Sequence, residues 1–185
     1  FEAERGKPFK PAPIQKPLTP QAGNFARYYS WSIMDFATRC FRFNEQIDEA
    51  NAALVENARH YIDHPKDIVD IDSFHWHSEM LCRLIEFYGS HGSIAPGRLK
   101  PETEAIMMEP IWSYVTRWNV PGESDPRNTY PPHTSDNHHT MHFITKWHFA
   151  KLAKDHPLFK DRKYPDGSTP AEQYEIWSKF IKAYC

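Results

Sequence analysis

Apolar residues recur at every third or fourth position along most of this chain, which is the spacing of one face of an α-helix. The longest such run extends from Phe25 to Leu54, and we expect it to divide into two helices at Asn44-Glu45. Because aromatic residues and a cysteine occupy its apolar face without a frame of charged residues, the run favours a helical repeat over a coiled coil. The apolar positions are Tyr29, Ile33, Phe36, Cys40, Phe43, Ile47, Ala50 and Leu54.

The same spacing predicts four later helices, at residues 72–88, 101–115, 136–155 and 171–185. Residues that typically start or stop helices lie at their ends: Gly89 as a stop, Pro101 in a first turn, and a capping box over residues 169–172. Pro110 is expected to kink or split the helix that Pro101 begins. No segment alternates like a strand, so we predict an all-α fold with five or six helices. The residues expected to be largely buried are Tyr29, Ile33, Phe36, Leu81, Leu84, Trp112, Ile144 and Ile181.

Proline sets the predicted domain boundary. Residues 1–22 contain five prolines among interspersed lysines, which favours an extended arm over a helix or a central strand. We expect residues 23–185 to form one helical domain. Its last helix has no Gly, Asn or Pro to stop it, so we also expect the domain to continue beyond Cys185 as a further C-terminal part of the same protein.

Composition narrows the possible partners. The chain is 40% hydrophobic and 25% charged with a net charge of -2, and it has no basic run and no apolar stretch of about 20 residues. We therefore expect neither nucleic-acid binding nor a membrane span. An aromatic content of 15% is typical of carbohydrate-binding clefts, although a core rich in aromatics would account for it equally. Since the chain starts at Phe1, a signal peptide or a tag is expected to have been removed, and we expect a secreted or periplasmic protein.

The richest chemistry lies in residues 131–139, where a long proline-containing loop meets the start of a helix. Ser135 or Asp136 can cap that helix, which places Asn137 and His138 in its first turn. The loop over residues 119–135 is long enough to be functional or disordered. Asn137 and His138 also have an ordinary structural interpretation, in which Asn137 only starts the helix and His138 is exposed to solvent.

Helical spacing separates the two side chains. Asn137 shares a stripe with Met141 and Ile144, whereas His138 lies about 100° around the helix on a stripe with His142 and Thr145. We therefore expect Asn137 to point towards the packed side or a concave site.

A second group of histidines occurs in the string of residues 75–79. His75 and Glu79 share a helical face, but His77 falls on the Leu81 stripe, so the three side chains do not converge on one ion. We expect a structural or cleft-lining role for this string.

Residues Asp136-Asn137-His138 resemble the Asn-His motif at a helix start in the helical-toroid polysaccharide lyases of the alginate-lyase-like group. The resemblance implies an all-α fold that is part or all of an (α/α) toroid of antiparallel helix hairpins, incomplete at its C-terminus. It implies β-elimination of a uronic-acid-containing, alginate-like polysaccharide. Asn137 would neutralise the substrate carboxylate, His138 would act as base or second donor, and no metal or other cofactor is expected.

The chain departs from the family pattern because such lyases complete the site with a Tyr and often an Arg, and the Tyr commonly lies further downstream than this chain extends. Local substitutes are Tyr130, Tyr114 and Arg127, of which Tyr130 on the approach loop is favoured. We expect Trp112, Trp118 and Tyr130 to line one concavity with the Asn-His pair. The predicted substrate-binding residues are Trp112, Trp118, Arg127, His139 and His142.

Other functions remain open at this stage. His138 and His142 lie four residues apart and could bind one ion with His133 or Asp136 in a metal-dependent hydrolase, although the string lacks the spacing of known zinc motifs. A non-catalytic glycan-binding or scaffold domain is a further alternative. Glycoside hydrolysis would need a pair of carboxylates, and no converging pair is apparent.

Overall fold

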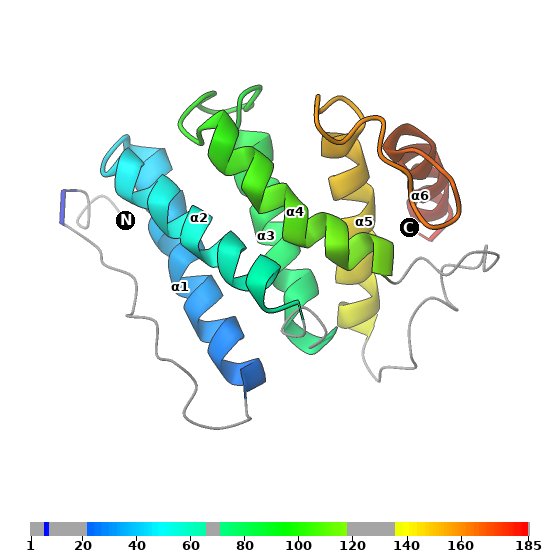
Figure 1. The fold of residues 1–185 in the computed structure, drawn as a ribbon, viewed down its shortest axis with the longest axis horizontal. Helices are drawn as coiled ribbons and strands as arrows, with labels where there is room; N and C mark the ends of the chain where they lie inside the picture. Colours follow the sequence, from blue (N-terminus) through cyan, green and yellow to red (C-terminus); the bar gives the residue numbers. More distant parts are fainter. Residues whose placement is uncertain (1–5, 8–21, 66–70, 118–135, 185) are drawn as a thin grey trace. The chain divides into compact units, whose positions relative to one another are not determined.

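The computed structural model describes residues 6–7, 22–65, 71–117 and 136–184, and at 22–28, 71–73, 117, 136–139 and 184 it describes the backbone alone. Within these residues the chain forms six α-helices and no strand, which confirms the all-α prediction (Figure 1). No helix in this part of the chain has the length and apolarity needed to cross a membrane. The helices are α1 (Ala22–Phe43), α2 (Ile47–Asp63), α3 (Ile71–Tyr88), α4 (Pro101–Arg117), α5 (Asp136–Ala153) and α6 (Pro170–Tyr184).

The chain divides into two compact units, Phe1–Pro110 and Ile111–Cys185. The boundary falls inside α4, directly after Pro110, and the helix continues through that proline instead of splitting. The predicted arm lies mostly outside the described residues. The toroid arrangement stays a prediction.

In the first unit, α1 and α2 form an antiparallel hairpin, and α1 also packs against α3 (Figure 1). The long apolar run divides where the sequence predicted, because Asn44 (φ 58°) and Gln46 (φ 48°) adopt the left-handed conformation that interrupts a helix. The faces of α1 and α3 that the apolar spacing predicted to be buried are the buried ones. Five predicted core residues are buried as expected: Tyr29, Ile33, Phe36, Leu81 and Leu84.

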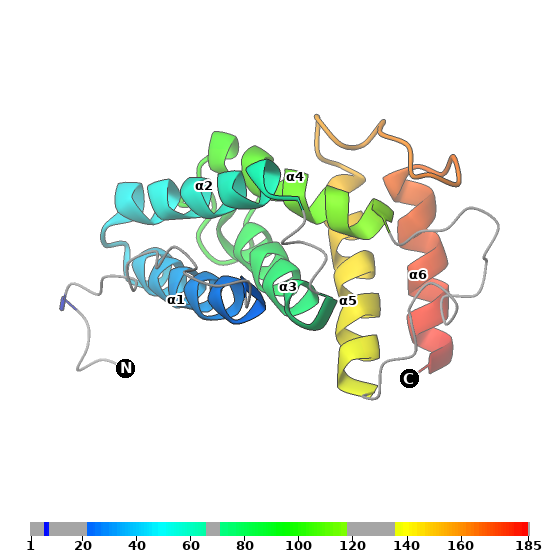
Figure 2. The same ribbon diagram turned by 60° about the horizontal axis from the view of Figure 1, so that its bottom comes forward.

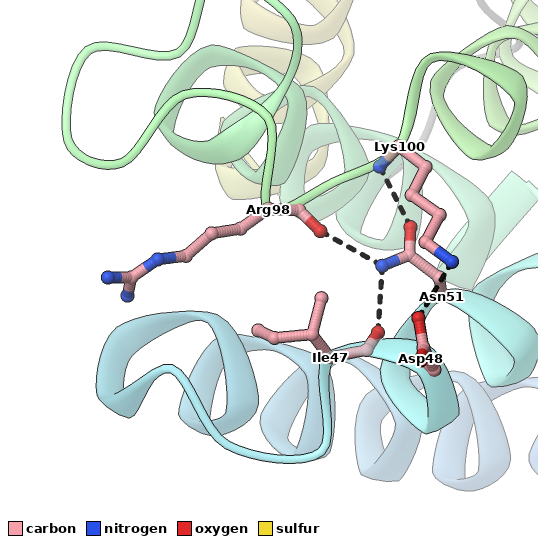
Figure 3. Close-up of polar contacts among 5 residues, drawn as sticks. All are labelled: Ile47, Asp48, Asn51, Arg98 and Lys100. Carbon is pink, nitrogen blue, oxygen red and sulfur yellow. Dashed lines mark hydrogen bonds and ion pairs between the residues drawn. The ribbon is translucent and has the colours of Figure 1, made fainter.

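Asn51 of α2 fixes the segment that leads into α4 (Figure 3). Its Nδ2 donates to the carbonyls of Ile47 (2.8 Å) and Arg98 (2.9 Å), while its Oδ1 accepts from the backbone N–H of Lys100 (2.9 Å). The Lys100 ammonium also pairs with Asp48 at 2.7 Å. Two of the three hydrogen bonds of the amide, those to Arg98 and Lys100, therefore tie the chain before α4 to α2, and the third is made within α2.

In the second unit, α5 and α6 run antiparallel and side by side (Figure 2). Phe143 of α5 contacts two aromatic rings of α6, those of Trp177 (5.7 Å between centroids) and Phe180 (4.7 Å). The predicted capping box is confirmed, since the N–H and hydroxyl of Thr169 donate to the Glu172 carboxylate at 2.7 and 2.8 Å.

In the second unit, the predicted burial is wrong at three positions. Trp112, Ile144 and Ile181 are partly exposed, not buried. In α5 the reason is that polar residues occupy inward positions and turn Ile144 towards the edge of the packed face. Among the α5 side chains that the structure describes, the buried ones are His142, Phe143, Thr145, Lys146, His148, Phe149, Ala150 and Ala153.

Candidate functional site

The first turn of α5 contains the Asn-His pair, as the sequence predicted. The helix begins at Asp136, so the backbone of Asn137, His138 and His139 lies at its positive end, where unpaired N–H groups favour an anion. The side chains of these residues lie outside the described part of the chain. So do the predicted site residues Tyr130, Trp118 and Arg127 and the loop that contains them.

One turn further along α5, His142 forms a buried pair with Tyr114 of α4. The Tyr114 hydroxyl and His142 Nδ1 share a hydrogen bond of 2.7 Å, and the two rings meet edge to face at 89°. Both residues have an exposed fraction of 0%. Since His142 follows His138 by four residues in α5, the pair lies one helical turn after the turn that contains His138.

The buried Tyr114–His142 hydrogen bond concerns two residues that the sequence analysis predicted for the site. His142 was expected to bind substrate, and Tyr114 was one of the local tyrosines considered for catalysis. The structure brings the two residues together, but within the packed interior. Their position suits support of the first turn of α5 better than direct contact with a polymer.

Lys146 extends the same stripe by one more turn and was not predicted. Its side chain is 2% exposed, and its Nζ has no hydrogen-bond partner among the described residues. Burial lowers the pKa of the amine from its ordinary value to about 7. The amine lies 4.9 Å from the ring centroid of Trp177.

Trp177 is held in place by a short chain of hydrogen bonds. Its indole Nε1 donates to Gln173 Oε1 at 2.8 Å, and Gln173 Nε2 donates in turn to Asp166 (3.0 Å) and Ser168 (2.8 Å). The indole therefore presents its face to Lys146 in a fixed orientation, with its N–H already satisfied.

Trp112, a predicted substrate-binding residue, belongs to a different aromatic group. It packs against Phe149 (6.2 Å between centroids), Phe159 (6.1 Å) and Tyr164 (4.9 Å). At a rise of 1.5 Å per residue, Phe149 lies roughly 18 Å along α5 from Asn137. The described contacts of Trp112 are thus towards the far end of the helix, and its role in binding stays a prediction.

The histidine string of α3 is part of the core of the first unit. His77 Nε2 donates to Asn57 Oδ1 (2.9 Å), and Asn57 Nδ2 donates to Ser30 Oγ (3.2 Å), which shares a hydrogen bond with Tyr61 (2.8 Å). Burial lowers the pKa of His77 to about 3, so the ring is neutral. These contacts support the structural role expected for the string.

Metal ligation has no support in the described part of the chain, where no three His, Cys, Asp or Glu side chains gather around a common point. The set that the sequence suggested includes His133, Asp136 and His138, whose side chains lie outside that part. A metal site at the start of α5 therefore stays an untested alternative.

Comparisons of the chain with protein-family models, with curated proteins and with solved structures found no match. The functional argument therefore depends on the residues and contacts of this chain. The resemblance at residues 136–138 stays a prediction.

Proposed function

We propose that the chain belongs to a secreted or periplasmic polysaccharide lyase of the helical-toroid type, which cleaves an alginate-like uronic-acid polymer by β-elimination. The observation that best supports this function is the arrangement of α5. Asn137 and His138 occupy the first turn of the helix, and the buried Tyr114–His142 hydrogen bond lies one turn beneath them.

The reaction makes two demands on a site. A base removes the proton on the carbon next to the substrate carboxylate, and those electrons form a carbon–carbon double bond as the bond to the glycosidic oxygen breaks. The departing oxygen takes up a proton from an acid. Negative charge develops on the carboxylate meanwhile, so neutral donors fixed around that group lower the barrier.

The residues at the start of α5 are suited to both demands. The Asn137 amide and the positive end of the helix would stabilise the charge on the carboxylate. His138 would act as base or second donor, and Tyr130 on the approach loop would supply the second proton-transfer group. None of these steps needs a metal ion or a cofactor.

We assign His142 a supporting role in place of direct substrate binding. Its ring is enclosed and hydrogen-bonded to Tyr114, so it would restrain the turn that contains His138. A catalytic group must be held within a fraction of an ångström of its productive position, and partners behind it provide that restraint.

Product chemistry tests the proposed function directly. The full-length protein, incubated with polymannuronate or polyguluronate, should form unsaturated uronate ends, which absorb ultraviolet light, in equal number to new reducing ends. New reducing ends without the absorbance would mean hydrolysis. If neither product forms but oligouronates protect tryptophan fluorescence, the non-catalytic glycan-binding alternative is correct instead.

A further inference from the structure

A line of three ionisable residues follows one stripe of α5. His138, His142 and Lys146 are spaced four residues apart, which places each residue one helical turn after the one before it. The two members whose side chains are described, His142 and Lys146, are buried at 0% and 2% exposure. The predicted catalytic turn is therefore continued into the interior by a hydrogen-bonded imidazole and then by an amine.

An amine in this position is an unusual feature of a packed interior. Lys146 Nζ finds no hydrogen-bond partner among the described residues, and it lies over the face of Trp177, 4.9 Å from the ring centroid. A methionine of similar size would fill the space without an unmet donor. Burial without a partner destabilises a fold and is common where a group has a functional task.

The buried titratable side chains on the described parts of α4 and α5 in this unit include Tyr114, His142 and His148, and burial is the cause of the lowered pKa of Lys146. From α6 it meets the uncharged indole of Trp177. The charged residues of α6 are exposed to solvent: Glu172, Glu175, Lys179 and Lys182.

We propose that Lys146 is a positioning residue of this site, whose ammonium charge acts on the buried Tyr114–His142 pair one helical turn away. The proposal extends the function proposed above and depends on it for its catalytic meaning. With a positive charge beneath it, the His142 ring resists taking up a second proton. It therefore stays a neutral partner of Tyr114 under the turn that presents His138.

The size of this effect follows from the helix geometry. Side chains four residues apart have Cβ atoms about 5–6 Å apart. A unit charge at roughly 6–10 Å, at the effective dielectric constant of about 20 that describes protein sites, shifts a titration by about one to two pH units. As pH rises through about 7, Lys146 loses its proton and this influence disappears.

The test is an NMR titration of the His142 ring in the full chain, identified by comparison with His142→Gln. Lys146→Met removes the charge and keeps the volume, and Lys146→Gln provides a second neutral variant. Lys151→Met is the matched control, because Lys151 lies on the same helix, half-buried beside Trp147.

We expect both Lys146 variants to raise the pH at which His142 titrates by about one to two units, with no change in the control. The low-pH limb of unsaturated-product formation should move in the same direction. An unchanged His142 titration in a folded Lys146 variant overturns the proposal. If His142 shifts but the wild-type protein forms no unsaturated product, the coupling stands and the proposed lyase function is wrong.

Discussion

Burial of His77 on α3 lowers the pKa of its imidazole to about 3, whereas an unfolded histidine titrates near 6.5. The unfolded chain therefore binds a proton that the folded chain resists, and the free energy of unfolding should fall as pH drops below about 6.5, by up to about 1.4 kcal/mol per pH unit until about pH 3. Urea denaturation at several pH values measures this slope. His77→Gln should flatten this slope between about pH 6.5 and pH 3 relative to the wild type and to His64→Gln, the matched control at an exposed histidine. Equal slopes for all three proteins would contradict the burial argument.

The buried hydroxyl of Tyr114 gives a second prediction at the scale of single residues. Tyr114→Phe leaves the His142 ring in the interior without its 2.7 Å hydrogen bond, so we expect the variant to lose about 1–3 kcal/mol of stability. Tyr174→Phe is the control, because Tyr174 is half-buried on α6. A Tyr114→Phe protein as stable as the wild type would show that the pair does not restrain α5.

At the scale of elements, the hydrogen bonds of Asn51 join α2 to the segment before α4 (Figure 3). Asn51→Ala removes all three and leaves the backbone N–H of Lys100 with its partner lost, so we expect a loss of about 2–3 kcal/mol in chemical denaturation. Asp48→Ala removes the exposed ion pair with Lys100, which water and salt screen, and should cost much less stability than Asn51→Ala. Similar losses for both variants would mean that the amide is not the main restraint.

The helix positions could be predicted from the sequence because their signals are local. The break at Asn44-Glu45, the stop at Gly89 and the capping box of Thr169 and Glu172 depend on residues within one or two turns. The buried face of α5 could not be predicted in this way. There the inward residues include His142 and Lys146, whose environments are set by Tyr114 and Trp177 from other helices.

At the scale of the whole molecule, the all-α character of the described residues and their six helices follow from the apolar periodicity, while the two-unit division does not. The division depends on which helices contact one another, and helical spacing contains no information on that. The candidate site was also only partly predictable, for the same reason. The first turn of α5 was predictable from its capping residues, but the buried pair beneath it depends on α4 and α5 meeting at one point.

The central claim is that Asn137 stabilises negative charge during β-elimination. The most direct measurement is the rate of unsaturated-product formation by Asn137→Ala, per folded molecule, in the full-length protein with its stability determined in parallel. We expect turnover to fall by roughly 10²–10³ with the fold intact, the scale found when one oxyanion-type donor is lost. A variant that loses about 1 kcal/mol of stability but keeps full turnover would show that Asn137 is only a helix-start residue, and would contradict the lyase account.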